Sequence, residues 1–304
     1  MTIAPASIYF GFCSTLRNLE LESTFFHWQD PLRAIFVSSL RSYYKLKRLT
    51  LQITRTAASV VSPEPHDPGL VKHVQPLPSS LEGFGLCGPL FTSRYAEGLV
   101  KAIPSLAQTV LASDGESVEG LSRILRCIQQ PDLLDYLSVL MSGVHVLSAD
   151  TLGYLRLFTR LNMIALDINI SPQHLFPVLA ELPLQQITLC SSTPAPTEQL
   201  VTLVSGNEKI KTLKQLKLNT VDAVRGKPVP REFTREELAK LNLEDLGWEL
   251  AEWTDGFSRE GFKEFLALAK KEEIEVTGDA VEALEIEDEW EEEMDYYRSV
   301  VESL

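Results

Sequence analysis

Three short segments of this chain, LNMIAL (residues 161–166), LQQITL (184–189) and LKQLKL (213–218), share one pattern of apolar residues. Each follows L-x-x-L-x-L, with isoleucine allowed in the apolar places. An apolar residue at every second position is typical of a β-strand with one buried face, and a recurrence every 20 to 30 residues or so is typical of a repeat architecture. The stretch therefore predicts three strands that belong to three successive structural repeats.

The same pattern extends in both directions along the chain. We find ten copies, which begin at residues 16, 46, 81, 106, 134, 161, 184, 213, 243 and 271. The copy at 243 uses Leu243, Leu246 and Trp248, and the weak last copy uses Lys271, Ile274 and Val276. Leucine is common, so one copy is a weak signal, but ten copies about 28 residues apart indicate a solenoid.

The segments between the copies supply the return path of each repeat. Apolar periodicity, proline and helix-start residues predict helices at 31–40, 92–103, 117–129, 150–159, 172–182, 196–204 and 258–270, and one that begins near Thr234. Residues 62–78 contain five prolines, which is incompatible with a regular helix, so we expect an inserted loop there. Strands alternating with helices define an α/β fold with a parallel sheet.

The repeat resembles the leucine-rich repeat, most closely the irregular repeats of F-box proteins and more loosely those of the ribonuclease-inhibitor type. The resemblance implies a leucine-rich repeat arc over residues 1–277, with a parallel concave sheet and convex helices. In F-box proteins the repeats select the substrate of a ubiquitin ligase, and a separate helical module docks an adaptor. No such module is recognisable before Leu16, so we expect either a fragment or a free-standing repeat protein.

Residues 278–304 differ in character from the repeats. Residues 272–297 hold 13 acidic residues and no Lys or Arg. An apolar stripe at helical spacing runs along the last residues, namely Trp290, Met294, Tyr297, Val301 and Leu304. We expect an acidic helical cap over the end of the hydrophobic core, and a detachable partner-binding helix is the alternative.

Composition limits the classes of partner and compartment. The formal net charge is −14, and nearly all of it lies in the acidic C-terminal part, so nucleic acid is not an expected partner. No apolar run reaches the ~18 residues of a membrane-spanning helix. The four cysteines are far apart in the sequence, which is typical of free thiols in a reducing compartment. We expect an intracellular protein, cytoplasmic or nuclear.

Motifs for catalysis or cofactor binding are weak. GFGLCG (residues 83–88) matches the dinucleotide fingerprint, but Pro89 follows where a helix should begin, and Phe84 and Leu86 hold core positions of a repeat. The five histidines are isolated from the cysteines and from one another, whereas a metal site needs several converging ligands. We expect no cofactor, no metal and no enzymatic activity.

The side chains between the leucines point away from the core and so define the expected recognition surface. In the middle of the array these positions are mostly small or apolar, and an apolar patch with a polar border is typical of a binding site. The expected partner-binding residues are Val110, Ala112, Tyr136, Ser138, Leu140, Met163, Ala165, Asp167, Gln186, Thr188 and Cys190.

Three functions remain open at this point. The first is a non-catalytic module that binds a protein on the concave strands. The second resembles the leucine-rich-repeat GTPase activators, which also end in an acidic segment, although their repeats are more regular. The third is a chaperone-like binder of basic proteins through the acidic segment, whose binding would fall steeply with salt.

Overall fold

The computed structural model describes residues 16–22, 43–52, 77–87, 94–113, 118–141, 149–190, 192–206, 209–219, 228–230, 251–253, 259–282 and 284. The expected helices at 31–40 and near Thr234, residues 62–76 of the expected loop at 62–78, and residues 283 and 285–304 of the acidic segment lie outside these ranges.

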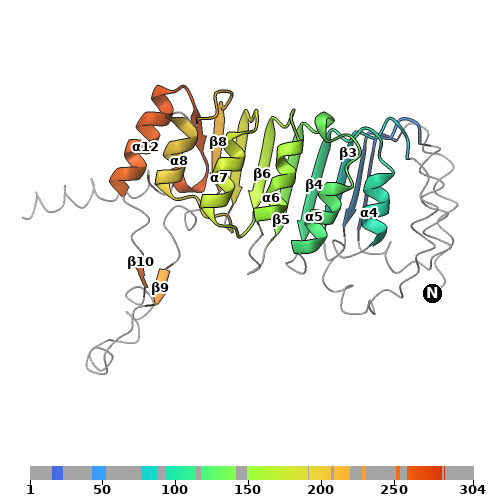
Figure 1. Cartoon of the computed structure of the whole chain (residues 1–304), viewed down its shortest axis with the longest axis horizontal. Helices are drawn as coiled ribbons and strands as arrows, with labels where there is room; N and C mark the ends of the chain where they lie inside the picture. Colours follow the sequence, from blue (N-terminus) through green and yellow to red (C-terminus); the bar gives the residue numbers. More distant parts are fainter. Residues whose placement is uncertain are drawn as a thin grey trace, which may run out of the picture.

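The described chain forms a nine-stranded parallel sheet in the order β1-β2-β3-β4-β5-β6-β7-β8-β11 (Figure 1). The strands are β1 (Asn18–Glu22), β2 (Arg48–Gln52), β3 (Gly83–Cys87), β4 (Gln108–Ser113), β5 (Tyr136–Met141), β6 (Met163–Asp167), β7 (Gln186–Cys190), β8 (Gln215–Asn219) and β11 (Glu275–Thr277). Each strand lies beside the strand that precedes it in this series, so the sheet grows in one direction along the chain.

Helices cover one face of this sheet (Figure 1). They are α4 (Arg94–Lys101), α5 (Val118–Arg126), α6 (Ala149–Gly153), α7 (Pro172–Ala180), α8 (Thr197–Val204) and α12 (Arg259–Lys271), with short 3₁₀ turns η4 (Pro131–Leu133) and η5 (Tyr154–Leu157). The helix α4 contacts α5, α5 contacts the turn η5, α7 contacts both α6 and α8, and α12 packs on α8. Among the described residues no helix lies on the opposite face, which we call the open face.

The expected register of the repeats is confirmed for the eight copies that begin at 16 to 213. The second apolar residue of each copy aligns with that of its neighbour, as in Leu137 with Ile164 and Ile164 with Ile187. The backbone hydrogen bonds between neighbouring repeats recur in the same form. The N–H groups of Gln185 and Gln186 both donate to the carbonyl of Asn162, and those of Lys214 and Gln215 both donate to the carbonyl of Gln185. Each of these repeats is therefore joined to the preceding one by the same pair of hydrogen bonds.

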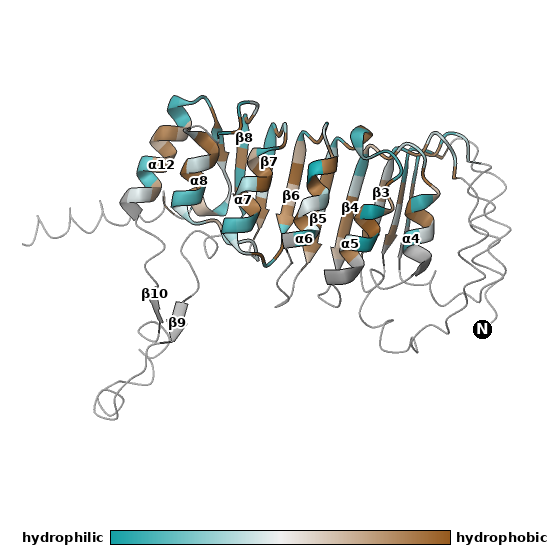
Figure 2. Cartoon of the chain, in the orientation of Figure 1, coloured by the Kyte–Doolittle hydropathy of each residue, from teal (hydrophilic) through white to brown (hydrophobic). Residues whose placement is uncertain are grey.

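The core lies between the sheet and the helices. Ile164, Leu166, Ile187 and Leu189 are at most 1% exposed, whereas the residues between them are partly exposed. Figure 2 shows the corresponding hydrophobic residues on the strands and on the helices. Two buried threonines replace apolar residues without leaving a polar atom unpaired. Thr109 donates to the carbonyl of Phe84, and Thr193 donates to the carbonyl of Leu166.

The end of the array differs from the sequence prediction. The copy at 243 lies outside the described residues, but β11 pairs directly with β8, so no strand fits between them. The expected order of the last strands is therefore wrong. Residues 220–258 instead connect β8 to α12 as an insertion, within which β9 (Pro228–Pro230) and β10 (Ala251–Trp253) pair antiparallel with one another.

The predicted alignment of the last copy, Lys271/Ile274/Val276, with the neighbouring strand is also wrong, by two residues. Val276 pairs with Leu216 and so takes the second apolar place of the repeat, where we had expected Ile274. Gly278 then follows with a φ of 107°, and a Cβ on it would lie 2.6 Å from the carbonyl oxygen of Leu218. Only glycine suits that close approach and that backbone conformation.

Candidate partner-binding face of the sheet

The open face is built from three rows of side chains that cross the strands. The register aligns the first residues of the strands in one row, the third residues in a second and the fifth residues in a third. Because alternate residues of a strand point to opposite faces, all three rows lie opposite the helices.

The middle of these rows contains the residues expected to bind a partner. The first row passes through Tyr136, Met163 and Gln186; the second through Val110, Ser138, Ala165 and Thr188; and the third through Ala112, Leu140 and Asp167, with Cys190 next along β7. All of them are partly exposed except Ser138, which is 3% exposed and so offers almost no surface to a partner. The structure thus brings the expected residues of four strands onto one continuous surface.

At the N-terminal end of the array, the open face has a different construction. Gly83 and Gly85 on β3 are buried, because the side chains of Arg48 and Thr50 on β2 lie over them. The Arg48 guanidinium crosses β3 and donates to the Gln108 side-chain oxygen on β4, 3.0 Å away. Gly83, the first glycine of GFGLCG, therefore makes room for the side-chain bridge from Arg48, and Gly85 makes room for Thr50, roles that the sequence alone did not suggest.

A hydrogen-bonded group fixes the C-terminal ends of β6 and β7. The backbone N–H of Ser192 donates to Asp167 Oδ1 at 2.7 Å, and the N–H of Ile168 donates to Thr193 Oγ1 at 2.8 Å. Asp167 is consequently held in place at the border of the apolar patch. We had singled out Asp167 from its position, whereas no sequence signal identified Thr193.

The environment of the two described thiols on the open face, Cys87 and Cys190, raises their pKa values. Burial raises the pKa of Cys87, and the Glu20 carboxylate raises it further. Burial likewise raises the pKa of Cys190, with Asp167 acting in the same direction. A raised pKa keeps the thiol protonated at neutral pH, and the thiolate is the nucleophilic form. These cysteines act here as small, weakly polar surface groups.

Within the described residues, no group of three or more His, Cys, Asp or Glu side chains is arranged to hold a metal ion. His174 lies exposed on α7, and the other four histidines fall outside those ranges. No helix of the described chain is long and apolar enough to cross a membrane. The middle strands of the open face, β4 to β7, can offer a partner apolar contact, amide and hydroxyl groups, and the oriented carboxylate of Asp167.

Comparison with known proteins supplied no relative: no protein-family model matches the chain, and no curated protein matches it. The described part of the chain is an α/β structure with a nine-stranded parallel sheet and helices on one face.

Proposed function

We propose that this protein is a non-catalytic recognition module of the leucine-rich repeat type, and that it binds a protein partner on the middle strands of the open face. The observation that carries the proposal is the continuous surface from Val110 on β4 to Thr188 on β7, which is partly exposed and has no described element packed on it. A face of this kind would normally be covered or kept polar in a protein that binds nothing.

The repeat architecture supports this proposal. Eight copies of one pattern align with one another, and in each copy after the first the second and third residues donate hydrogen bonds to one carbonyl of the preceding copy. This regularity resembles the leucine-rich repeat, whose concave strands commonly bind proteins. Selection of a substrate for an F-box-type ubiquitin ligase is the particular role that the resemblance suggests, in the cytoplasm or the nucleus.

The chemistry of the face indicates the kind of partner surface. Tyr136, Leu140 and Met163 supply the largest apolar area in the middle of the patch, and aromatic and methionine side chains are enriched at the centre of protein interfaces. Gln186 and Thr188 on one flank can donate and accept hydrogen bonds. The matching partner surface is apolar in its centre, with polar groups that can pair with amides and hydroxyls.

A tagged purification from native cells, followed by mass spectrometry, tests the proposal. We would compare the intact chain with Met163→Glu on the open face and with the control Gln173→Glu, which adds the same charge on the exposed side of α7. The proposal expects a specific protein that is recovered with the intact chain and the control and is reduced at least tenfold with Met163→Glu. Equal recovery with all three proteins would contradict it. An adaptor or ligase subunit among the recovered proteins would support the F-box role.

A further inference from the structure

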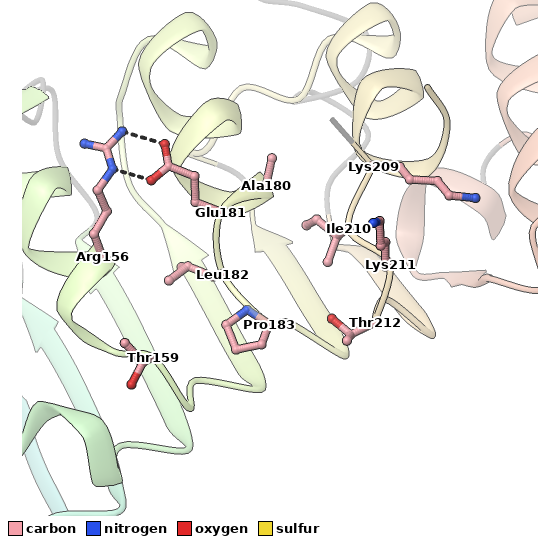
Figure 3. Close-up of a pocket in the computed structure, with 10 residues that line it drawn as sticks. All are labelled: Arg156, Thr159, Ala180, Glu181, Leu182, Pro183, Lys209, Ile210, Lys211 and Thr212. Atoms are coloured by element: carbon pink, nitrogen blue, oxygen red, sulfur yellow. Dashed lines mark hydrogen bonds and ion pairs between the residues drawn. The ribbon is translucent and has the colours of Figure 1, made fainter. Parts of the chain in front are cut away.

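A groove with a basic rim lies at the edge of the sheet where the strands begin. Its volume is about 530 Å³, and its lining comes from the three successive connections that precede β6, β7 and β8 (Figure 3). Leu182 and Ile210, each 4% exposed, form its apolar base together with Ala180 and Pro183. We call this the edge groove. It lies apart from the open face and is built by different residues.

Cations predominate around the edge groove. Arg156, Lys209 and Lys211 line it, whereas Glu181 is the only acidic residue among its described lining residues. Figure 3 shows Arg156 bound to Glu181 on one side, through hydrogen bonds of 2.5 and 3.0 Å, and the two lysines on the other. Lys209 pairs with Glu272 at 2.7 Å.

Three further observations favour an acidic, partly apolar ligand. Lys211, Arg160 and Lys214 are all exposed, and none of them has an ion-pair partner within the described ranges. Arg160 lies in the connection before β6, and Lys211 and Lys214 lie in the connection before β8. Leu157, next to Arg156, is 51% exposed, which is unusual among the described leucines. Uncompensated cations beside exposed apolar surface are the complement of an acidic amphipathic helix.

The chain itself contains such a segment. Residues 285–304 include nine acidic residues and one arginine, together with the apolar stripe from Trp290 to Leu304. Ala280 and Leu284, which come just before, are each 6% exposed, so the chain is already packed against the core up to Leu284.

The segment is long enough to reach the edge groove. It follows β11, which pairs with β8, and the connection before β8 forms one wall of the groove. The strand β8 is five residues long, about 17 Å at the usual rise per residue. Twenty helical residues span about 30 Å, and an extended segment spans more.

We propose that residues 285–304 dock intramolecularly in the edge groove, with their carboxylates on Lys211 of its lining and on the neighbouring Arg160 and Lys214, and with their apolar stripe on the partly exposed Ala180 and Pro183 and on Leu157. This inference is independent of the proposed function, because the edge groove and the open face share no residue.

Zero-length cross-linking of carboxylates to lysines tests the inference in the full chain. Equal amounts of ¹⁴N- and ¹⁵N-labelled protein would be mixed, so that mass spectrometry separates links within one chain from links between two chains. Docking predicts links within one chain from residues 285–304 that concentrate on Lys209, Lys211 and Lys214. Links spread over all exposed lysines, including Lys45, Lys101 and Lys217, would overturn it, as would links formed mainly between chains.

A charge-reversal variant provides the second arm. The triple variant carries Arg160→Glu, Lys211→Glu and Lys214→Glu but keeps Lys209, which lines the groove and can still be cross-linked. The yield of cross-links between Lys209 and residues 285–304 should fall at least tenfold in this variant. The control Lys45→Glu reverses an exposed charge in the connection before β2, far along the sheet, and should leave those links unchanged. All four positions are exposed, so the far-ultraviolet circular dichroism of each variant should match that of the intact chain. Unchanged links to Lys209 in the triple variant would overturn the inference.

Discussion

The division between a buried and an open face predicts very different costs for two neighbouring substitutions on β6. Leu166 is 1% exposed on the helix side, whereas Met163 is partly exposed on the open face. Truncating a buried leucine costs about 3 kcal/mol through lost burial and the cavity that remains. Burying a carboxyl group without a partner adds roughly 2 kcal/mol or more, so Leu166→Asp should cost about 5 kcal/mol in total.

That cost is comparable with the whole stability of a typical protein, which is about 5–15 kcal/mol. Met163→Glu should cost less than about 1 kcal/mol, because a substituent on a partly exposed face stays in contact with water. The assay is urea unfolding followed by circular dichroism, with the midpoints of both variants compared with that of the intact chain. Leu166→Asp should be unfolded or nearly so without urea, and Met163→Glu should unfold close to the intact chain. Equal destabilisation by the two substitutions would refute the assignment of the faces.

Four further predictions concern single features of the structure. Gly85→Ala should lower the free energy of unfolding by roughly 1–3 kcal/mol, because its Cβ would lie 2.9 Å from Thr50 Cγ2, and the double variant with Thr50→Ala should recover most of the loss in a urea titration. Gly278→Ala should release β11 from β8, seen as faster amide hydrogen exchange of Val276 and Thr277, because both the left-handed φ and the contact with Leu218 exclude a side chain. Arg156→Gln should raise the pKa of Glu181, which the Arg156 guanidinium lowers. A carboxyl group with a lowered pKa stabilises the folded protein above its ordinary pKa, and this stabilisation is lost as the pH falls through the lowered value. Thermal unfolding should therefore show the variant to be less stable than the intact chain at pH 7 and equally stable in strong acid. Cys87 and Cys190 should react slowly with iodoacetamide at pH 7 and faster as the pH rises above the usual thiol range, followed by mass spectrometry, and fast reaction at pH 7 would contradict their raised pKa values.

The strands could be predicted from the sequence because the L-x-x-L-x-L pattern shows both the alternation of residues within a strand and the distance from one strand to the next. The copies at 161, 184 and 213 became β6, β7 and β8 in the expected register. The prediction of a strand at 243 between the last two strands is wrong, although Leu243, Leu246 and Trp248 match the repeat pattern. A six-residue pattern does not specify which strands will pair with one another. Pairing of β11 with β8 is a property of the folded chain.

The two-residue error in the last copy has a simple physical cause. A strand pattern has period two, so a shift by two residues leaves every side chain on the same face and cannot be detected from polarity. Ile274 and Val276 are both apolar and fit either register. The distinguishing features are the positive φ of Glu273 and the close approach of Gly278 to Leu218, and neither is visible in a hydrophobic pattern.

The sequence pattern also gave an incomplete picture of the candidate sites, because it does not show contacts between side chains of different strands. Strand alternation was sufficient to select the open-face residues, but it did not reveal that Ser138 is covered or that Arg48 bridges β3 to reach Gln108. The edge groove could not be predicted at all, because Arg156, Leu182 and Lys211 come from three connections that converge only when the strands pair.

The central claim is that the middle strands of the open face carry recognition, and the dissociation constant of the recovered partner tests it most directly. Ala165→Arg places a long charged side chain in the centre of the second row, between Ser138 and Thr188, and Gln173→Arg places the same side chain on α7. In a biolayer interferometry titration the account predicts at least tenfold weaker binding for Ala165→Arg and unchanged binding for Gln173→Arg. Unchanged binding for Ala165→Arg, with the fold intact by circular dichroism, would place recognition elsewhere and contradict the claim.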